Sequence, residues 1–386
     1  MGLFRLALAI SVLLGHSGGH GLFGLAFLDR QVAVECFFMI SGFYMALVLN
    51  EKYLGPGRYW TFIQQRFLRL YPTYFILLVV ILLLDGTVSL VSGKAFASMQ
   101  PWADNAQVLT PGSIALFVGA NLLILGQDIV ALLSLDHVTG QLSFFSHNGH
   151  PFIVGHWFFL NRPSWSLSVE FCFYLLAPFI VCRGAGIQAG VLLASVALRY
   201  FFMHCLGDET PWNYTFFPPN LGFFIAGSLG YLLYRKYRTP MEAALPSYKW
   251  ICFVFGAVVV TYNRLPFSHQ LYLVFFPIVC VMVPLLFAAT RTNRVDRLIG
   301  ELSYPFYLIH QHVLIYLFVL FNGHTQTFYA PACVILTTLL AYLFYRFIET
   351  RTEHYREGLY QKAKNQNLVR KDAPLADDPQ PSEVFK

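Results

Sequence analysis

The sequence predicts an all-α fold, a polytopic membrane bundle of about ten transmembrane helices. Hydrophobic residues make up 56% of the 386 residues and charged residues only 12%, whereas a soluble domain carries about 25% charged residues. Apolar windows also recur along most of the chain, each long enough, or nearly so, to cross a bilayer core of roughly 30 Å as a helix. These two observations exclude a soluble globular domain.

The first predicted span is the N-terminal segment that carries Arg5 and His16. A cleaved signal peptide would also begin with a basic residue before a short apolar run, but the many later spans favour a membrane helix. The other predicted spans are 31–50, 71–84, 165–182, 187–206, 218–234, 249–264, 270–289, 300–321 and 328–348.

Lysine and arginine residues gather in four segments, which predicts the orientation of the chain. By the positive-inside rule all four are expected to be cytoplasmic, so an even number of spans joins each to the next. The four segments are 51–70, 235–249, 291–297 and the chain after Arg346.

This orientation decides how the apolar stretch 112–135 is interpreted. Counting it as a span would place the basic segment near Arg235 outside, and Asn121, Gln127 and Asp128 interrupt it. We therefore expect a re-entrant or interfacial helix within a long outward-facing segment, with both termini cytoplasmic.

Other features of the sequence argue against a cysteine-based site, a nucleic-acid-binding surface and a metal site. The seven cysteines lie scattered in apolar windows without a Cys-x-x-Cys pair, as expected of residues that pack in a core. The net charge of +6 belongs mostly to the predicted cytoplasmic segments and indicates attraction to anionic lipids, and no nucleic-acid-binding patch stands out. His147, His150 and His156 complete no recognisable metal spacing, so no metal site is expected.

The first group of candidate site residues is Arg5, His16 and Glu35, followed by Ser41. Arg5 and His16 are eleven residues apart, about 16 Å on a helix, and project from nearly the same face. Ionisable groups inside a membrane usually face a cavity or a partner. A histidine oriented by a carboxylate suits general-base or proton-relay work; the alternative is a histidine that merely caps backbone carbonyls.

The second group is the pair Arg66 and Arg69, three residues apart and therefore on one helix face. Paired guanidinium groups suit bidentate recognition of phosphate. The alternative is an orientation anchor at the cytoplasmic end of the following span.

The third group is Trp165, Ser168 and Glu170, at the outer start of a span. These side chains suit a hydroxylated substrate through stacking and hydrogen bonds, although a tryptophan at this position is also typical of the interfacial belt. The fourth is a polar stripe of Tyr304 and His310, with Tyr307 between them. It indicates either a substrate pathway or hydrogen bonds between helices.

Taken together, these motifs resemble the acyltransferase type 3 family of membrane proteins, which O-acylate surface polysaccharides and other glycans. The resemblance runs from about Phe4 to Thr350 and is specific only because five motifs occur in register. The first motif is Arg5 and His16, which are separated by ten residues. The other four are Phe-Phe-x-x-Ser-Gly-Phe at 37–43, Arg-x-x-Arg at 66–69, Trp-Ser-Leu-x-x-Glu at 165–170 and Ser-Tyr-x-x-Tyr-Leu-x-His at 303–310.

The resemblance implies an acyl-CoA co-substrate, acetyl-CoA first of all, with no bound cofactor. Arg66 and Arg69 would hold the donor's phosphates, and His16 would act as base or transient acyl carrier. Glu35 would orient His16, and Arg5 would offset developing negative charge. On the acceptor side, a glycan or lipid-linked saccharide would meet Ser41, Trp165, Ser168, Glu170, Tyr304 and His310.

Two departures from the family pattern concern the end of the chain. No proline follows Glu349, and no hydrolase-like domain is expected after the last span. We expect a membrane acyltransferase domain at 1–350 and a polar, disordered cytoplasmic tail at 351–386, because the tail lacks the apolar residues of a core.

Two other functions stay open at this point. A proton-coupled transporter would also place polar residues on apolar helices but would not need the arginine pair. An acyltransferase acting on a protein, lipid or small molecule would share the donor site and differ only in the acceptor. The resemblance places the protein in a bacterial inner membrane, as a multi-pass protein among membrane lipids.

Overall fold

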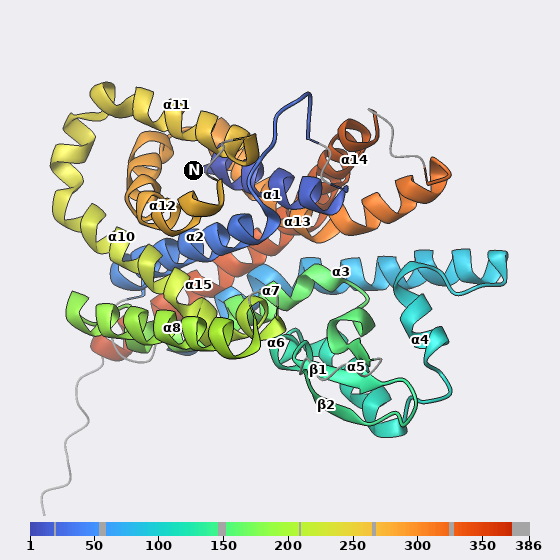
Figure 1. Ribbon diagram of the computed structural model, residues 1–386. Coiled ribbons are helices and arrows are strands. Elements are labelled where there is room, and N and C mark those ends of the chain that lie inside the picture. Colours follow the sequence, from blue (N-terminus) through green and yellow to red (C-terminus); the bar gives the residue numbers. More distant parts are fainter. Residues whose placement is uncertain are drawn as a thin grey trace, which may run out of the picture.

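The computed structural model describes residues 1–18, 21–53, 59–145, 152–207, 210–264, 268–323 and 328–372. Helices account for most of these residues, and the molecule is a helical membrane protein (Figure 1). Among the described residues, six segments are long and apolar enough to cross a membrane: Arg30–Glu51, Tyr59–Ser92, Ala185–Leu206, Pro211–Ala243, Arg294–Leu320 and Tyr329–Lys362.

Two pairs of helices form the centre of the bundle. Helix α2 (Arg30–Glu51) packs along α10 (Phe217–Ala243), and α1 (Gly2–His16) packs along α13 (Arg294–Leu320). Small residues permit this approach, as is usual between membrane helices. A β-carbon on Gly42 would lie 1.9 Å from the Phe224 carbonyl oxygen, so the two backbones nearly touch.

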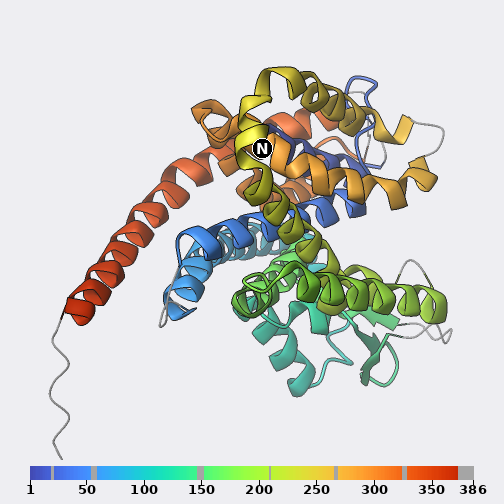
Figure 2. The ribbon, with the colours of Figure 1, turned by 90° about the vertical axis from the view of Figure 1, so that its left-hand side faces the viewer.

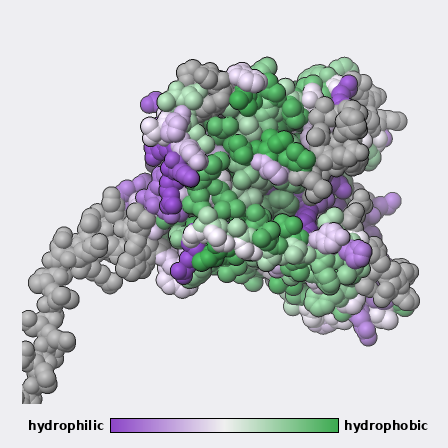
Figure 3. Space-filling model, turned by 60° about the vertical axis from the view of Figure 1, so that its left-hand side comes forward, coloured by the Kyte–Doolittle hydropathy of each residue, from purple (hydrophilic) through white to green (hydrophobic). Residues whose placement is uncertain are grey.

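The remaining helices surround this centre. The apolar side chains of α3 (Tyr59–Ser92) and α8 (Ala185–Leu206) are largely exposed, as expected of helices that face lipid. Figure 3 shows apolar side chains over much of one face of the molecule, with polar ones at its margins. The other helices are α7 (Trp165–Ile180), α9 (Pro211–Tyr214), α11 (Leu245–Thr261), α12 (Ser268–Thr290) and α14 (Tyr329–Phe344), with short turns at η4 (Tyr262–Arg264) and η5 (Tyr345–Glu349, a π-helix).

The segment between α3 and α7 contains a small sheet that the sequence did not predict. Three antiparallel strands lie in the order β2-β1-β3, with Ser134 of β1 opposite both Ser143 and Val154. They pack with short helices at the lower right of Figure 1. The elements of this segment are η1 (Ala97–Met99), α4 (Gln100–Asp104), α5 (Pro111–Leu123), α6 (Gln127–Val130), β1 (Leu133–Asp136), β2 (Leu142–Phe144), β3 (Phe152–Val154), η2 (Gly155–Phe158) and η3 (Arg162–Ser164).

The apolar stretch 112–135 does not form one helix. Helix α5 has 13 residues, so it is about 20 Å long, and it ends at Ile124, whose φ of 49° is incompatible with helix. The interrupting polar side chains are buried and bonded: Asn121 donates to the Phe158 carbonyl at 2.9 Å, and Gln127 donates to the Tyr74 hydroxyl at 3.1 Å. The stretch thus folds back on itself among the described residues.

The four basic segments meet at one end of the bundle. The N-terminal ammonium of Met1 lies 2.7 Å from Asp296 at the start of α13. Glu242 at the end of α10 accepts from Arg291 at 2.8 Å and from Arg238 at 3.1 Å. Segments far apart in sequence therefore share one polar end.

The first part of the predicted tail is helical. Residues after the π-turn form α15 (Thr350–Asp372), which crosses behind α2 in Figure 1 and extends away from the bundle in Figure 2. Its first turns pack against α3. Residues 373–386 lie outside the described residues.

Candidate active site

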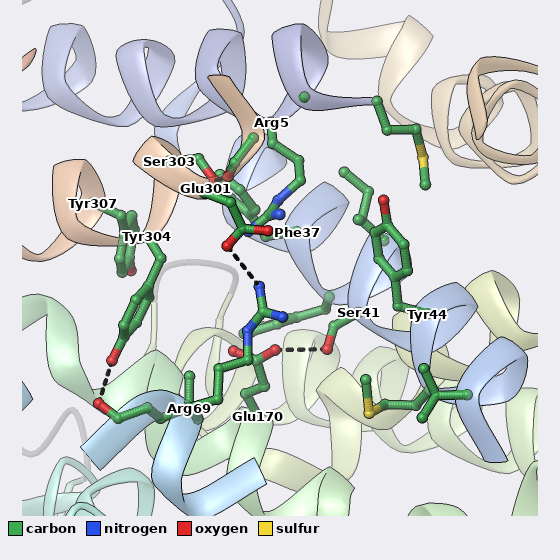
Figure 4. Close-up of a pocket in the computed structure, with 18 of the residues that line it drawn as sticks. Arg5, Phe37, Ser41, Tyr44, Arg69, Glu170, Glu301, Ser303, Tyr304 and Tyr307 are labelled. Atoms are coloured by element: carbon green, nitrogen blue, oxygen red, sulfur yellow. Dashed lines mark hydrogen bonds and ion pairs between the residues drawn. The ribbon is translucent and has the colours of Figure 1, made fainter. Parts of the chain in front are cut away.

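A cavity of about 460 Å³ opens between α1, α2, α3, α7 and α13. This volume is within the usual range of small-molecule sites. Figure 4 shows side chains from these helices directed into it. Arginines gather in its wall: Arg5, Arg66, Arg69, Arg291 and Arg297.

Arg66 and Arg69 reach the cavity from one face of α3. Arg66 is buried, with its guanidinium carbon 5.6 Å from the Phe62 ring centre, and its Nε atom has no hydrogen-bond partner among the described residues. Arg69 makes a long ion pair of 3.8 Å with Glu301 on α13 (Figure 4). The wall therefore offers positive charge that carboxylates only partly offset.

Glu170 lies in this same cavity and not on a separate acceptor side. It accepts hydrogen bonds from Ser41 at 2.6 Å and from Tyr174 at 2.5 Å. Tyr304, also in the wall, donates to the Leu70 carbonyl oxygen at 2.7 Å (Figure 4). Ser41, Glu170 and Tyr304, which were expected on the acceptor side, thus share the cavity with the arginine pair.

Tyr307 forms the inner end of the cavity. Its hydroxyl is 2.9 Å from that of Ser166, and its ring packs 6.0 Å from that of Phe37. Beyond it, the His310 ring centre lies 5.7 Å from that of Tyr307, and the His16 ring centre lies 5.6 Å from that of His310. A line of rings therefore connects the cavity with His16.

His310 presents one free ring nitrogen in this line. Its Nδ1 is 2.5 Å from the Tyr307 carbonyl oxygen, and because a carbonyl only accepts, Nδ1 carries the proton. Nε2 is then an acceptor; it is buried and has no hydrogen-bond partner in the part of the chain that the structure describes. Such an unpaired buried acceptor is rare and marks a place for a transferable proton or a ligand atom.

Arg5 and His16 lie at opposite ends of α1. Arg5, in the first turn, lines the cavity, and His16 is the last residue of the helix and keeps an exposed surface. Their separation is the expected one of about three turns. The cavity thus approaches α1 from one end, and His16 is accessible from the other.

Glu35 does not orient His16. Its carboxylate forms an ion pair with Arg199 of α8 and accepts from Gln31 at 3.1 Å. Because α2 presents this side chain toward α8 rather than α1, the expected Glu35–His16 contact is wrong for the described residues. The pair neutralises two charges inside the bundle.

Trp165 and Ser168 make packing and hydrogen-bond contacts within the protein. The Trp165 ring is 7% exposed and packs 4.6 Å from the Tyr214 ring. Ser168 donates to Asp128 at 2.7 Å and accepts from the Gly126 backbone at 3.0 Å, which fixes the turn after α5. Neither lines the cavity, so their expected contact with a substrate is not supported.

A different tryptophan packs against Arg162, whose charge acts on His16. Trp157 is 41% exposed, and the guanidinium carbon of Arg162 lies 4.1 Å from its ring centre. The charge of Arg162 acts on both His16 and His156. Burial, and then Arg162, lower the pKa of His156 to about 4, so this histidine is neutral at pH 7.

A model of the acyltransferase domain family, acyltransferase type 3, matches residues 1–346. The chain belongs to this family. The match covers the arginine-lined cavity, His16 and His310, and it makes the protein a membrane acyltransferase of a family that generally acylates glycans. No curated protein and no solved structure matches the chain.

Several residues of this acyltransferase escaped the sequence analysis as site residues. Arg199 was detectable as a lone arginine in an apolar window, which needs a buried carboxylate such as Glu35 as its partner. Tyr307 was visible in the polar stripe, but its place between cavity and His310 was not. Trp157 gave no signal, because it belongs to none of the five motifs.

No metal site is formed by the described residues of this acyltransferase, where no three histidine, cysteine or acidic side chains cluster. His147 and His150 lie outside the described residues.

Proposed function

We propose that this acyltransferase transfers an acyl group, acetyl first of all, from cytoplasmic acyl-CoA to a hydroxyl of a glycan or lipid-linked saccharide. The observation that carries the proposal is the continuous arrangement of an arginine-lined cavity, Tyr307, His310 and His16. The family match supports acyl transfer, and the geometry supports two substrates that approach from opposite ends.

The cavity suits an acyl-CoA donor. The arginines at its polar end match the phosphates, since guanidinium groups bind phosphate oxygens bidentately. Apolar side chains between that end and Tyr307 suit the thin chain that joins the phosphates of the donor to its thioester. These side chains are Phe37, Phe38, Met45, Val48 and Phe287. The thioester would then extend past Tyr307 and His310 to reach His16.

Two reaction sequences use this geometry. In the first, His16 takes the proton of the acceptor hydroxyl while its oxygen attacks the thioester carbonyl. The new C–O bond forms, the C–S bond breaks, and the thiolate regains a proton from the imidazolium. In the second, His16 attacks first and carries the acyl group until the hydroxyl displaces it. Arg5 lies about three turns away, so it would act on the donor and not on His16.

In this proposal His310, and not Glu35, is the partner of His16. Its protonated Nδ1 is held by the Tyr307 carbonyl, and Nε2 is left as an acceptor close to His16. A proton from His16 can therefore pass to His310 Nε2, and from there to the leaving thiolate.

The acceptor would approach His16 from the outward-facing segment. Trp157 and Arg162 supply an exposed aromatic ring and a cation beside it, a combination that stacks on sugar rings and binds their oxygens. This side would face the exterior of a bacterial inner membrane, with both termini in the cytoplasm.

Binding of donors to the protein in zwitterionic lipid nanodiscs tests the proposal. Isothermal titration with acetyl-CoA should show binding that weakens at least about tenfold when Arg66 and Arg69 are both changed to Gln, because two charge-assisted contacts are lost. A matched control is Arg183→Gln, an exposed arginine that does not line the cavity. Absence of binding across a panel of acyl-CoA species would overturn the proposal and favour a carrier.

A further inference from the structure

Helix α15 lies beyond residue 346, where the family match ends, yet it is attached to the arginine-bearing helix α3. Gln65 of α3 donates to the Arg356 carbonyl oxygen at 2.9 Å. One turn further along, the Tyr360 ring lies 5.6 Å from that of Tyr53, and the ammonium of Lys52 lies 3.9 Å above Tyr360. These contacts fix the first turns of α15 in position.

This attachment brings a third guanidinium group toward the arginine pair. Arg356 and Arg69 line one small cavity of about 50 Å³, which shares Arg69, Glu301 and Tyr304 with the main cavity. The charges of Arg66, Arg69 and Arg356 are close enough to act on one another. The small cavity is thus a side branch at the polar end of the main one.

Only one arginine of this cluster has a carboxylate at ion-pair distance among the described residues. Arg69 has Glu301 at 3.8 Å. Within the part of the chain that the structure describes, neither Arg66 nor Arg356 has a carboxylate at ion-pair distance. The Nε atom of each is buried without a hydrogen-bond partner.

Like charges held together in a partly buried place destabilise the protein unless an anion joins them. The carboxylates that line the small cavity, Glu301, Glu349 and Glu353, lower this repulsion but leave the two Nε–H groups unused. A tetrahedral oxyanion accepts from several guanidinium groups at once. The geometry therefore calls for a phosphate-like group near Arg66 and Arg356.

We propose that α15 completes the donor site, with Arg356 binding a phosphate of the acyl-CoA donor together with Arg66 and Arg69. This inference rests on the proposed function. The same chemistry would suit the phosphate of an anionic lipid headgroup, so the experiment must separate the two sources.

The test compares Arg356→Gln with the wild type in phosphatidylcholine nanodiscs. We expect the Kd of acetyl-CoA to rise about tenfold, the loss of one charge-assisted contact, while turnover of S-acetyl-N-acetylcysteamine, which lacks phosphate, stays unchanged. Arg351→Gln, on an exposed residue of the same helix that lines neither cavity, should change neither value.

Other outcomes are distinguishable. Unchanged acetyl-CoA affinity in Arg356→Gln, with weakened affinity in Arg66→Gln, would overturn the role of α15 and leave the donor site intact. No acetyl-CoA binding by the wild type would overturn the proposed function and this inference together. Unchanged affinity with a loss of co-purified phosphatidylglycerol, measured by native mass spectrometry, would assign the cluster to a lipid headgroup.

If Arg356→Gln weakened acetyl-CoA binding and turnover of the phosphate-free donor equally, its effect would be a loss of fold and the inference would be wrong. Gln65→Ala provides an independent check, because it removes the hydrogen bond that holds Arg356 in place without altering any charge. We expect it to weaken acetyl-CoA binding less than Arg356→Gln and to leave turnover of the phosphate-free donor unchanged.

Discussion

Ser41 donates a hydrogen bond of 2.6 Å to Glu170, across 129 residues of sequence. The bond joins α2 to α7 in the wall of the cavity, and Tyr174 donates to the same carboxylate oxygen. Two sequence motifs that looked independent therefore form one polar contact beside the arginine pair.

This contact predicts strong coupling between the two residues. Glu170→Ala should destabilise the protein by about 1–3 kcal/mol, because it leaves two partly buried hydroxyls unpaired, and Ser41→Ala by about 1 kcal/mol. The double variant should be less destabilised than the sum, by at least about 0.5 kcal/mol. Denaturant unfolding in detergent micelles measures all three, and additive effects would argue against the contact.

The close approach of α2 and α10 predicts a steric effect at Gly42. A methyl group there would lie 1.9 Å from the Phe224 carbonyl oxygen, so Gly42→Ala must separate the helices and should sharply lower the yield of monodisperse protein. Gly190→Ala in α8 is the control, since no atom lies within 4 Å of its β-carbon position. It should be neutral or stabilising by up to about 1 kcal/mol, from helix propensity. Equal yields of both variants would contradict the packing.

The two tryptophans should behave differently. Trp157→Ala should raise the KM for the acceptor several-fold and leave acetyl-CoA binding unchanged, because the ring is exposed beside Arg162 and lies outside the cavity. Trp165→Ala should instead destabilise the fold by about 3–5 kcal/mol, as expected for a buried aromatic ring. Steady-state transfer assays and thermal unfolding separate these effects, and an acceptor defect confined to Trp165→Ala would reverse our assignment.

Acid should destabilise the protein through His156. Its pKa of about 4 in the folded state is below the value of 6.5 expected on unfolding. The unfolded state therefore binds more protons between these values, and stability falls as the pH drops from about 6.5 to 4. His156→Asn should reduce this slope, measured as the melting temperature at pH 7, 5.5 and 4.5. An identical slope in the variant would show that His156 is not the group concerned.

The sequence predicted a helical membrane protein and the pairing of Arg66 and Arg69 on one helix face, but not that Arg5 shares a cavity with them. It did so because apolar windows report bilayer crossing directly and because residues three apart share a helix face. It did not predict which polar side chains face one another. Glu35 pairs with Arg199, 164 residues away, and only the packing of α2 and α8 on α10 decides that.

Two kinds of element were not predicted from the sequence, for local physical reasons. The strands β1 to β3 have three or four residues each, too short to show alternation against an apolar background. Helix α15 has the charged composition of a disordered tail, and its attachment depends on Lys52 and Tyr53, which belong to another part of the sequence. Composition describes a segment alone and misses such partners.

The central claim is that the donor binds in the arginine-lined cavity and reacts at His16, beyond Tyr307. The most direct test measures acetyl-CoA binding and label transfer from radiolabelled acetyl-CoA for His16→Ala in the same nanodiscs. Our account predicts unchanged donor binding, because His16 lies outside the cavity, together with at least a 10³-fold loss of transfer, the scale of a lost general base or nucleophile. Retained transfer in His16→Ala would contradict it.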